Sequence, residues 1–344
     1  MTIPFCAAPP LKVVKTMLTE AFDKVKFDCF WSGTSNVPPH DNETIKSDDI
    51  SIVTAFFDIG REAWSNGNRI DQRHKRSVDV YLSYFSNLAK IKNQVIIFID
   101  EHLAQKVLDM RAANGLADKT VIFTSKNFFL ADEILNISHR IQAIMNGKFH
   151  DYIWTKSSPE YNDPKYVLVN AFKSFFAVYA IDKKIVTSPQ VAWIDFGYCR
   201  DNDRFDSNTP WRFNAHIKMN LFYILSLNDE PVFSIVKEGD VYFQGGHLIG
   251  DLSSWVDFRK EIDISFRSLI DCGFIDDDQT LILMAYRRNP TSYIIHPVDS
   301  KDWFVIFKYF NSSTLITAAE VRKKRKRSSP IWWKEFKLWL SQRF

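Results

Sequence analysis

Short apolar runs that alternate with helical patterns constrain the fold of this chain more than any other feature of its sequence. Each run is rich in β-branched or aromatic residues and ends in polar residues, as buried strands do. The stretches between and after them carry apolar side chains at helical spacing. The predicted strands are residues 50–57, 95–99, 120–124 and 191–194, and the predicted helices are residues 77–91, 101–113, 127–145, 166–181 and 255–270. This alternation predicts an α/β fold with a mainly parallel sheet that helices cover on both faces.

The composition divides the chain into three parts. Residues 1–48 form an N-terminal extension, in which a predicted helix is followed by a loop rich in Gly, Ser, Asn and Pro. Residues 49–311 hold the alternating pattern and are the predicted functional domain. Residues 312–344 form a basic, amphipathic tail. A length of 344 residues suits one large α/β unit with additions, or two units.

Several classes of protein are excluded. The longest stretch without Asp, Glu, Lys or Arg has 12 residues, which is too short for a membrane-spanning helix. The first residues lack the apolar core of a signal peptide. The four cysteines are far apart and form no Cys-x-x-Cys pair, so we expect free thiols rather than a zinc cluster or a disulfide scaffold. These features predict a protein of the reducing cytoplasm.

Acidic residues stand where two predicted strands end. The chain has no P-loop, no dinucleotide-binding Gly-x-Gly-x-x-Gly and no Gly-x-Ser-x-Gly elbow. However, Asp58 follows the run 50–57, and Asp195 follows the run 191–194. Ligands of open parallel sheets bind beyond the carboxyl ends of the strands, so each carboxylate is a candidate to meet a metal ion or a sugar hydroxyl. The alternative is a loop aspartate that caps a turn.

Four motifs in a fixed order carry a resemblance to a known family. They read IVTAFFDIGR at residues 52–61, WIDFG at 193–197, GGHLIG at 245–250 and DDQ at 277–279. Together they resemble the HtrL/YibB family over about residues 50–310. This family occurs among bacterial lipopolysaccharide and capsule genes and is glycosyltransferase-like. The resemblance implies a GT-A-like, Rossmann-type mixed sheet and a nucleotide-sugar-dependent hexosyltransferase.

The resemblance also implies a divalent cation, Mn²⁺ or Mg²⁺, that stabilises the departing nucleoside diphosphate. GT-A enzymes typically hold it with Asp-x-Asp, whereas here Asp195 is followed by Phe196 and Gly197. The expected metal ligands are therefore Asp195 and His296, or Asp195 with water. His296, close to the Lys-Asp-Trp sequence at 301–303, has the alternative of a structural histidine. Retention and inversion at the sugar stay open.

Donor-binding residues follow from the same resemblance. Some of them fall where GT-A folds hold the nucleobase and the ribose, and others are cations suited to a diphosphate. The expected donor-binding residues are Thr54, Phe56, Asp58, Arg61, Arg73, Lys173 and Asp195. A solvated helix face is the alternative for the cations. A UDP-sugar is the favoured donor.

The later motifs are assigned to catalysis and to the acceptor. An acidic residue in this region of inverting GT-A enzymes takes the proton of the acceptor hydroxyl, which makes Asp278 and Asp277 the catalytic candidates. An aspartate at a helix start also caps the helix, and different members of the triplet can take different roles. Gly245, Gly246 and His247 are expected to shape the acceptor pocket, with a tight hairpin as the alternative.

The tail predicts contact with a membrane. The chain has a net charge of +3, and its six consecutive basic residues, 322–327, leave the remainder slightly acidic. A Trp-rich amphipathic helix is predicted next to them, and this combination suits an anionic bilayer surface, where each basic residue contributes about 1 kcal/mol. The alternatives are a helix docked on the protein's own core and a nucleic-acid site. The second is weaker, because no recognisable nucleic-acid module is present.

These observations predict a cytoplasmic glycosyltransferase, peripheral on the inner face of the cytoplasmic membrane. It would move a sugar from a nucleotide-sugar donor to a lipid-linked lipopolysaccharide or capsule glycan, without a nucleic-acid partner. The alternative is a non-catalytic protein with a GT-A-like fold that binds glycans or assists their assembly. The missing second acid after Asp195 favours that alternative.

Overall fold

A computed structural model describes most of the predicted functional domain. The described residues are Trp31, 33–35 and 49–309, without 66, 68, 203, 214–217, 226, 299–302 and 305. Almost all of the predicted N-terminal extension and the whole predicted tail lie outside the described residues, as do Lys301 and Asp302.

The fold is a mixed, mainly parallel sheet flanked by helices, which confirms the predicted class. Its eight strands lie in the order β1-β4-β3-β2-β5-β7-β6-β8. Strands β4, β3, β2 and β5 are parallel neighbours, β8 is parallel to β6, and β7 runs antiparallel between β5 and β6. The strands are β1 (Gly33–Ser35), β2 (Ile50–Phe56), β3 (Val95–Asp100), β4 (Thr120–Ser125), β5 (Gln190–Ile194), β6 (Met219–Tyr223), β7 (His247–Asp251) and β8 (Tyr293–Pro297).

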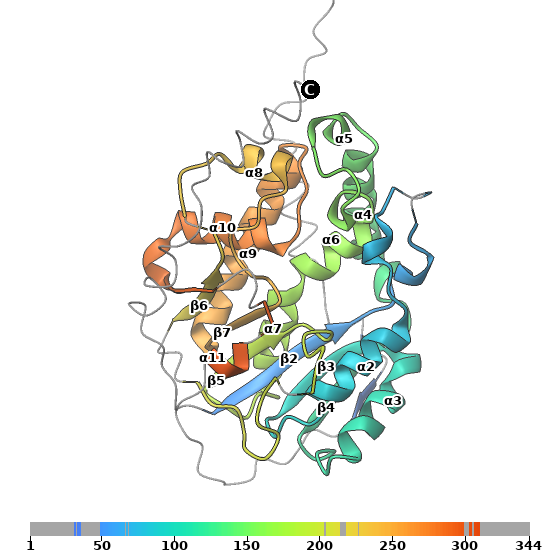
Figure 1. The fold of residues 1–344 in the computed structure, drawn as a ribbon, viewed down its shortest axis with the longest axis vertical. Helices are drawn as coiled ribbons and strands as arrows, with labels where there is room; N and C mark the ends of the chain where they lie inside the picture. Colours follow the sequence, from blue (N-terminus) through green and yellow to red (C-terminus); the bar gives the residue numbers. More distant parts are fainter. Residues whose placement is uncertain are drawn as a thin grey trace, which may run out of the picture.

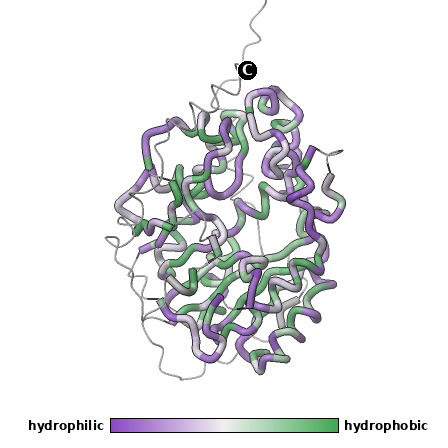
Figure 2. The backbone as a smooth tube through the Cα atoms, viewed as in Figure 1, coloured by the Kyte–Doolittle hydropathy of each residue, from purple (hydrophilic) through white to green (hydrophobic). Residues whose placement is uncertain are grey.

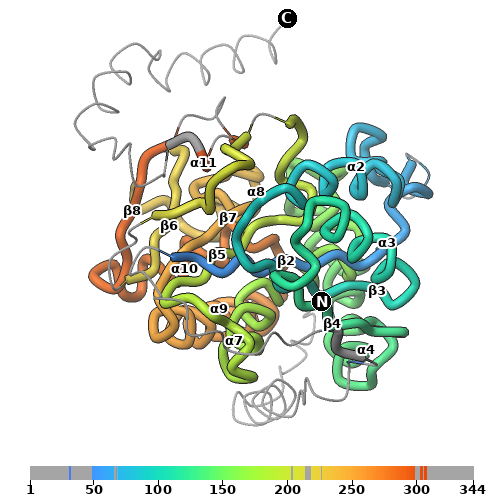
Figure 3. Tube along the Cα trace, turned by 90° about the horizontal axis from the view of Figure 1, so that it is seen from below, coloured from blue at the N-terminus to red at the C-terminus, as the bar shows by residue number. Residues whose placement is uncertain are grey.

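Helices cover both faces of this sheet, as Figures 1 and 3 show. In Figure 3, α2 and α3 lie on one side of the strands, and α4, α7 and α9 lie on the other. The α-helices are α2 (Val78–Leu88), α3 (Glu101–Ala112), α4 (Asp132–Met145), α5 (Phe149–Tyr152), α6 (Pro164–Ala171), α7 (Lys173–Asp182), α8 (Val232–Glu238), α9 (Leu252–Asp271), α10 (Asp278–Arg288) and α11 (Ile306–Tyr309). Short 3₁₀ turns complete the fold, among them η2 (Arg61–Ala63) and η4 (Gln72–His74).

Strand β2 shows why the central strands are apolar throughout. All seven of its residues are buried. Because successive side chains point to opposite faces, Val53 and Ala55 pack in the core under α7 and α9, whereas Ile52 and Phe56 pack in the core under α2. The strands at the centre of Figure 2 are accordingly hydrophobic, and the outer turns of the helices carry most of the hydrophilic residues.

The single helix predicted over residues 166–181 is two helices in the structure. Helix α6 ends at Ala171, and α7 begins at Lys173. The residue between them, Phe172, is fully buried and serves as C-cap of one helix and N-cap of the other. The break therefore places the side chain of Lys173 in the first turn of a new helix.

A buried arginine ties α3 to the segment between α2 and β3. Arg111 is fully buried and donates hydrogen bonds to the carbonyl oxygens of Ala89, Ile91 and Asn93 at 3.0, 2.6 and 3.0 Å. We expect Arg111→Met to lower the free energy of unfolding by about 3 kcal/mol, because these carbonyls lose their partner while staying buried. Urea unfolding measures this, with Arg140→Met, at an exposed ion pair with Asp271, as control. Equal effects of the two substitutions would contradict the prediction.

Candidate active site

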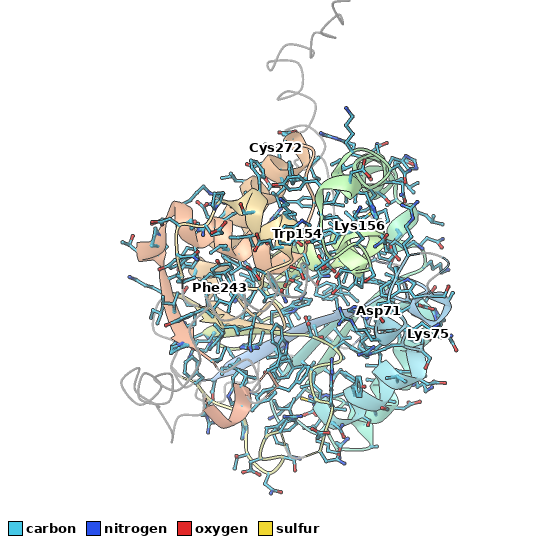
Figure 4. All side chains as sticks on the ribbon, turned by 45° about the horizontal axis from the view of Figure 1, so that its top comes forward. Asp71, Lys75, Trp154, Lys156, Phe243 and Cys272 are labelled. Atoms are coloured by element: carbon cyan, nitrogen blue, oxygen red, sulfur yellow. The ribbon has the colours of Figure 1, made fainter. Side chains whose placement is uncertain are left out.

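A cleft of about 530 Å³ opens beyond the carboxyl ends of β2 and β5. The chain runs outward from β2 through β3 to β4 and then returns to the other side of β2 to form β5. The gap between β2 and β5 is thus the point where the strand order reverses, which is where open parallel sheets bind their ligands. In Figure 4, Asp71 and Lys75 flank η4 on one side of these strand ends, and Phe243 lies on the other.

The floor of the cleft holds a buried ammonium group between two carboxylates. The Nζ atom of Lys173 lies 3.0 Å from Oδ1 of Asp195 and 2.8 Å from Oδ2 of Asp278. It also donates to the carbonyl oxygen of Gly245 at 3.0 Å. The side chains of Lys173 and Asp278 are 7% and 8% exposed, whereas that of Asp195 is 41% exposed. We call Lys173, Asp195 and Asp278 the floor triad.

The charges of the floor triad depend on one another. Burial opposes the charge of Lys173, but the two carboxylates outweigh it and hold the pKa of the ammonium above its ordinary value. Burial raises the pKa of Asp278, and the charge of Lys173 acts in the opposite direction. Lys173 also stands in the first turn of α7, where the helix dipole disfavours a cation. The two carboxylates therefore provide the stabilisation that keeps this lysine charged.

The three aspartates before α10 have different partners. Asp277 is the N-cap of the helix and accepts the N–H of Gln279 at 2.9 Å. The carboxylate of Asp278, the next residue, accepts a hydrogen bond from the ammonium of Lys173. Asp276 is buried and hydrogen-bonded inside the core. Asp277 thus has the capping role that was the alternative for these residues, and both Asp277 and Asp278 line the cleft.

Two of the three expected acceptor residues line the cleft. Gly245 and Gly246 lie in the approach to β7, and the carbonyl of Gly246 accepts the N–H of Asp195 at 2.9 Å. The backbone carbonyls of both glycines accept hydrogen bonds from the floor triad, and the pair does not form the tight hairpin that was the alternative. His247 is the first residue of β7 and is buried against Phe222, away from the cleft. Burial and the charge of Lys173 lower the pKa of His247 to about 3.

Arginines form the rim on the β2 side. The guanidinium of Arg61 donates to the carbonyl of His74 at 2.9 Å and to the hydroxyl of Tyr81, and it lies 4.7 Å from the ring centroid of Trp64. Arg73 is exposed and pairs with Asp71 at 3.4 Å. Both line the cleft, as expected of donor-binding residues.

Three further residues line the cleft that were not predicted from the sequence: Arg76, Tyr81 and Arg200. Arg200 comes five residues after Asp195, in the same strand-end loop, and Arg76 belongs to the basic stretch that begins with Arg73. Extending the strand-end argument to the whole of each loop would have found both arginines. Tyr81 lies on α2, and no sequence signal points to it.

The expected nucleobase and ribose residues are only partly at the cleft. Phe56 lines it and packs between Phe196 and Tyr81, each with a centroid distance of 4.9 Å. Thr54 is fully buried within β2 and does not line the cleft. Asp58 is exposed, and its carboxylate accepts the N–H of Gly60 at 2.8 Å, so it caps a turn.

The structure does not bring the two expected metal ligands together. His296 lies on β8, three strands or roughly 14 Å from β5, and its ring bonds to Asn220 at 2.8 Å. The Oδ1 atom of Asp195 already accepts from Lys173 and from Nε1 of Trp193. Within the ranges that the structure describes, no three acidic, histidine or cysteine side chains gather as ligands. These residues do not fit a protein-held divalent cation, because the ammonium of Lys173 occupies the space between the carboxylates.

None of the helices in the described part of the chain combines the length and the apolar character needed to cross a bilayer.

Comparison with known proteins gives one family, a curated relative and several distant solved structures, two of which are described below. The family HtrL_YibB, described as a bacterial protein of unknown function, matches residues 48–312. Protein HtrL of Escherichia coli (strain K12) is 33% identical over 273 residues, which cover 77% of this chain and 93% of that protein. Mouse xyloside xylosyltransferase 1 (apo form) has 8% identity and a TM-score of 0.35 over 76% of this chain and 93% of its own. The PaToxG glycosyltransferase has 11% identity and a TM-score of 0.28 over 91% and 90%.

Gly245 is expected to tolerate no side chain. A Cβ atom there would lie 1.9 Å from Oδ2 of Asp278, whereas at Gly246 the nearest atom is Oδ2 of Asp195 at 3.4 Å. We expect Gly245→Ala to displace Asp278 from Lys173 and to lower the free energy of unfolding by about 2 kcal/mol. Gly246→Ala, the matched control, should cost much less. Urea unfolding of both variants measures the difference, and a larger loss for Gly246→Ala would refute this account of the glycine pair.

Proposed function

The chain belongs to the HtrL_YibB family, and from its cleft we propose that it is a glycosyltransferase that moves a sugar from a nucleotide-sugar donor to a glycan acceptor. The observation that carries the proposal is the floor triad, which faces an open cleft with a cationic rim at the switch point of the sheet. A UDP-sugar is the favoured donor. A lipid-linked lipopolysaccharide or capsule glycan is the favoured acceptor, because the resemblance implies it.

The reaction assigns Asp278 as general base. Its carboxylate takes the proton of the acceptor hydroxyl while the acceptor oxygen forms a bond to C1 of the donor sugar. The bond from C1 to the diphosphate breaks, and its electron pair stays on the phosphate oxygen. Lys173 supports this role, because its charge opposes the effect of burial and favours the ionised form of Asp278. Asp195 is partly exposed in the cleft and is proposed to accept a hydrogen bond from a donor hydroxyl.

The departing diphosphate needs cations. The guanidinium of Arg61 is held in the cleft by a backbone carbonyl and by aromatic rings, so little side-chain freedom is lost when it meets a phosphate. Arg73 adds a second guanidinium on the same rim. Charge-assisted hydrogen bonds of this kind stabilise negative charge that develops on the leaving group.

The cellular setting is part of the same proposal. A transferase that acts on a lipid-linked acceptor works at a membrane surface, and the basic run 322–327 beside a Trp-rich segment suits an anionic one. We therefore propose a protein peripheral on the cytoplasmic face of the inner membrane. This rests on the sequence, since the tail lies outside the described residues.

A non-catalytic glycan-binding protein is the second candidate. The observation that favours it is that both carboxylates of the floor triad are engaged by Lys173. Donor turnover separates the two candidates, because slow hydrolysis of a nucleotide-sugar requires an active site, whereas glycan binding does not.

A screen of nucleotide-sugars tests the proposal directly. A ligand that binds only the folded state raises its melting temperature, and at a concentration about 100 times its Kd it adds about 2.7 kcal/mol of stability. We expect a UDP-sugar to raise the melting temperature by several degrees, uridine to raise it far less, and free sugar to be released slowly. If no nucleotide-sugar stabilises the protein, with or without Mn²⁺, the proposed transferase function is wrong.

The base assignment predicts two kinetic effects. Asp278→Asn should lower kcat by about 10²–10⁴-fold, which is the usual contribution of a general base. Lys173→Met should move the acidic limb of the pH–rate profile to higher pH, because loss of the cation raises the pKa of Asp278 and the base is then protonated at a higher pH. Lys165→Met, at an exposed lysine on α6, is the control. An acidic limb that stays in place in Lys173→Met would exclude Asp278 as the titrating base.

A further inference from the structure

We propose that the diphosphate of the donor is bound by four arginines around Tyr81, without a divalent cation held by the protein. We call Arg61, Arg73, Arg76 and Arg200 the arginine cluster. The inference rests on the proposed function, since it names how that site binds the leaving group. It adds Arg76 and Arg200 to the donor site and replaces the expected metal ion.

Three members of the cluster surround one side chain, that of Tyr81, although they come from distant segments of the chain. The hydroxyl of Tyr81 accepts a hydrogen bond from Arg61, and the charges of Arg61, Arg76 and Arg200 all act on it. Nη1 of Arg76 donates a hydrogen bond to the backbone carbonyl oxygen of Arg73 at 2.7 Å, which links these two arginines. All four arginines line the same cleft.

Most of the positive charge of the cluster has no carboxylate partner among the described residues. In the part of the chain that the structure describes, Arg73 is the only one of these four arginines with a carboxylate partner, and that ion pair with Asp71 is exposed. Partial burial and the charges of Arg76 and Arg61 lower the pKa of Arg200. The nearest carboxylate in the cleft floor, Asp195, is already engaged by Lys173. Cations crowded without counter-ions at the mouth of a cleft form a site for an anion.

The guanidinium groups are positioned before any ligand arrives. Arg61 is held by the carbonyl of His74, and the guanidinium of Arg200 lies 4.1 Å from the ring centroid of Phe304. Stacking leaves the edge of a guanidinium open for two parallel hydrogen bonds, the geometry that phosphate oxygens accept.

Gly197 links the arginine cluster to the missing second acid. The Asp-x-Asp pattern would require a carboxylate at this position, where the sequence has glycine. A Cβ atom at Gly197 would lie 2.9 Å from the ring of Tyr81, so a larger residue would displace that ring. Tyr81 thus fills the space that the side chain of a second acid at position 197 would need. From there its hydroxyl accepts a hydrogen bond from Arg61 and orients that guanidinium. The ring of Tyr81 therefore contacts the arginines and also leaves no room for an aspartate at position 197.

Calorimetry with inorganic pyrophosphate tests the inference on the full-length protein. We expect binding in the presence of EDTA, weakening as NaCl is raised because the contacts are ionic. Arg76→Gln and Arg200→Gln should each weaken binding by about ten- to hundredfold, the loss expected for hydrogen bonds to a charged group. Arg200→Lys keeps the positive charge but loses the forked guanidinium, so it should weaken pyrophosphate binding by an intermediate amount. It also tests the inference if Arg200→Gln does not fold.

Arg259→Gln is the matched control. Arg259 also lies over an aromatic ring, that of Phe175 at 4.3 Å, but it lines a different pocket between α7 and α9. Its substitution should leave pyrophosphate binding unchanged.

The outcomes separate this inference from the proposed function. If pyrophosphate binds only when Mn²⁺ is present, or if the Arg76 and Arg200 variants bind as well as the control, the inference is overturned while the transferase proposal stands. Absence of binding under both conditions overturns it as well. The proposed function is judged independently by nucleotide-sugar binding and donor hydrolysis.

Discussion

The ion pairs of one buried lysine determine how the cleft is built. Removing an ammonium group from water costs several kcal/mol unless carboxylates compensate for it, and Lys173 has two of them within 3.0 Å. Its partners are contributed by the end of β5, the approach to β7 and the start of α10, so one charged group joins segments far apart in the sequence. Loss of either carboxylate would remove part of the stabilisation that keeps this ammonium charged while it is buried.

The framework of the fold could be predicted because burial on both faces leaves a plain signal in the sequence. Runs such as 95–99 are apolar at every position only when helices cover both sides of the sheet. The strand-end rule then placed Asp195 in the cleft, and the position of Lys173 on an apolar helix marked it as unusual. Asp277 and Asp278 were both predicted as catalytic candidates with helix capping as the alternative, and the structure shows that Asp277 caps α10 while Asp278 pairs with Lys173.

Other site residues could not be predicted, because their positions depend on the direction of a side chain or on how a loop folds. Thr54 lies in a strand that leads to the cleft, yet its side chain is buried inside the sheet. His247 and His296 occupy β7 and β8, and neither lines the cleft. Arg76 and Arg200 reach the cleft only because their loops fold toward Tyr81, which is a tertiary arrangement that local patterns do not encode.

In the proposed transfer reaction, the two groups of charged residues in the cleft have different roles. The proposed base, Asp278, is buried, and the charge of Lys173 opposes the effect of burial on its pKa. The arginine cluster lines the same cleft, and among the described residues three of its four members have no carboxylate partner, so we propose that it is available to a departing anion. If a metal ion lay between Asp195 and Asp278, it would compete with Lys173 and raise the positive charge beside the base. We propose that arginines on the rim stabilise the leaving group without this competition, which would explain why the chain has a single acid at the end of β5.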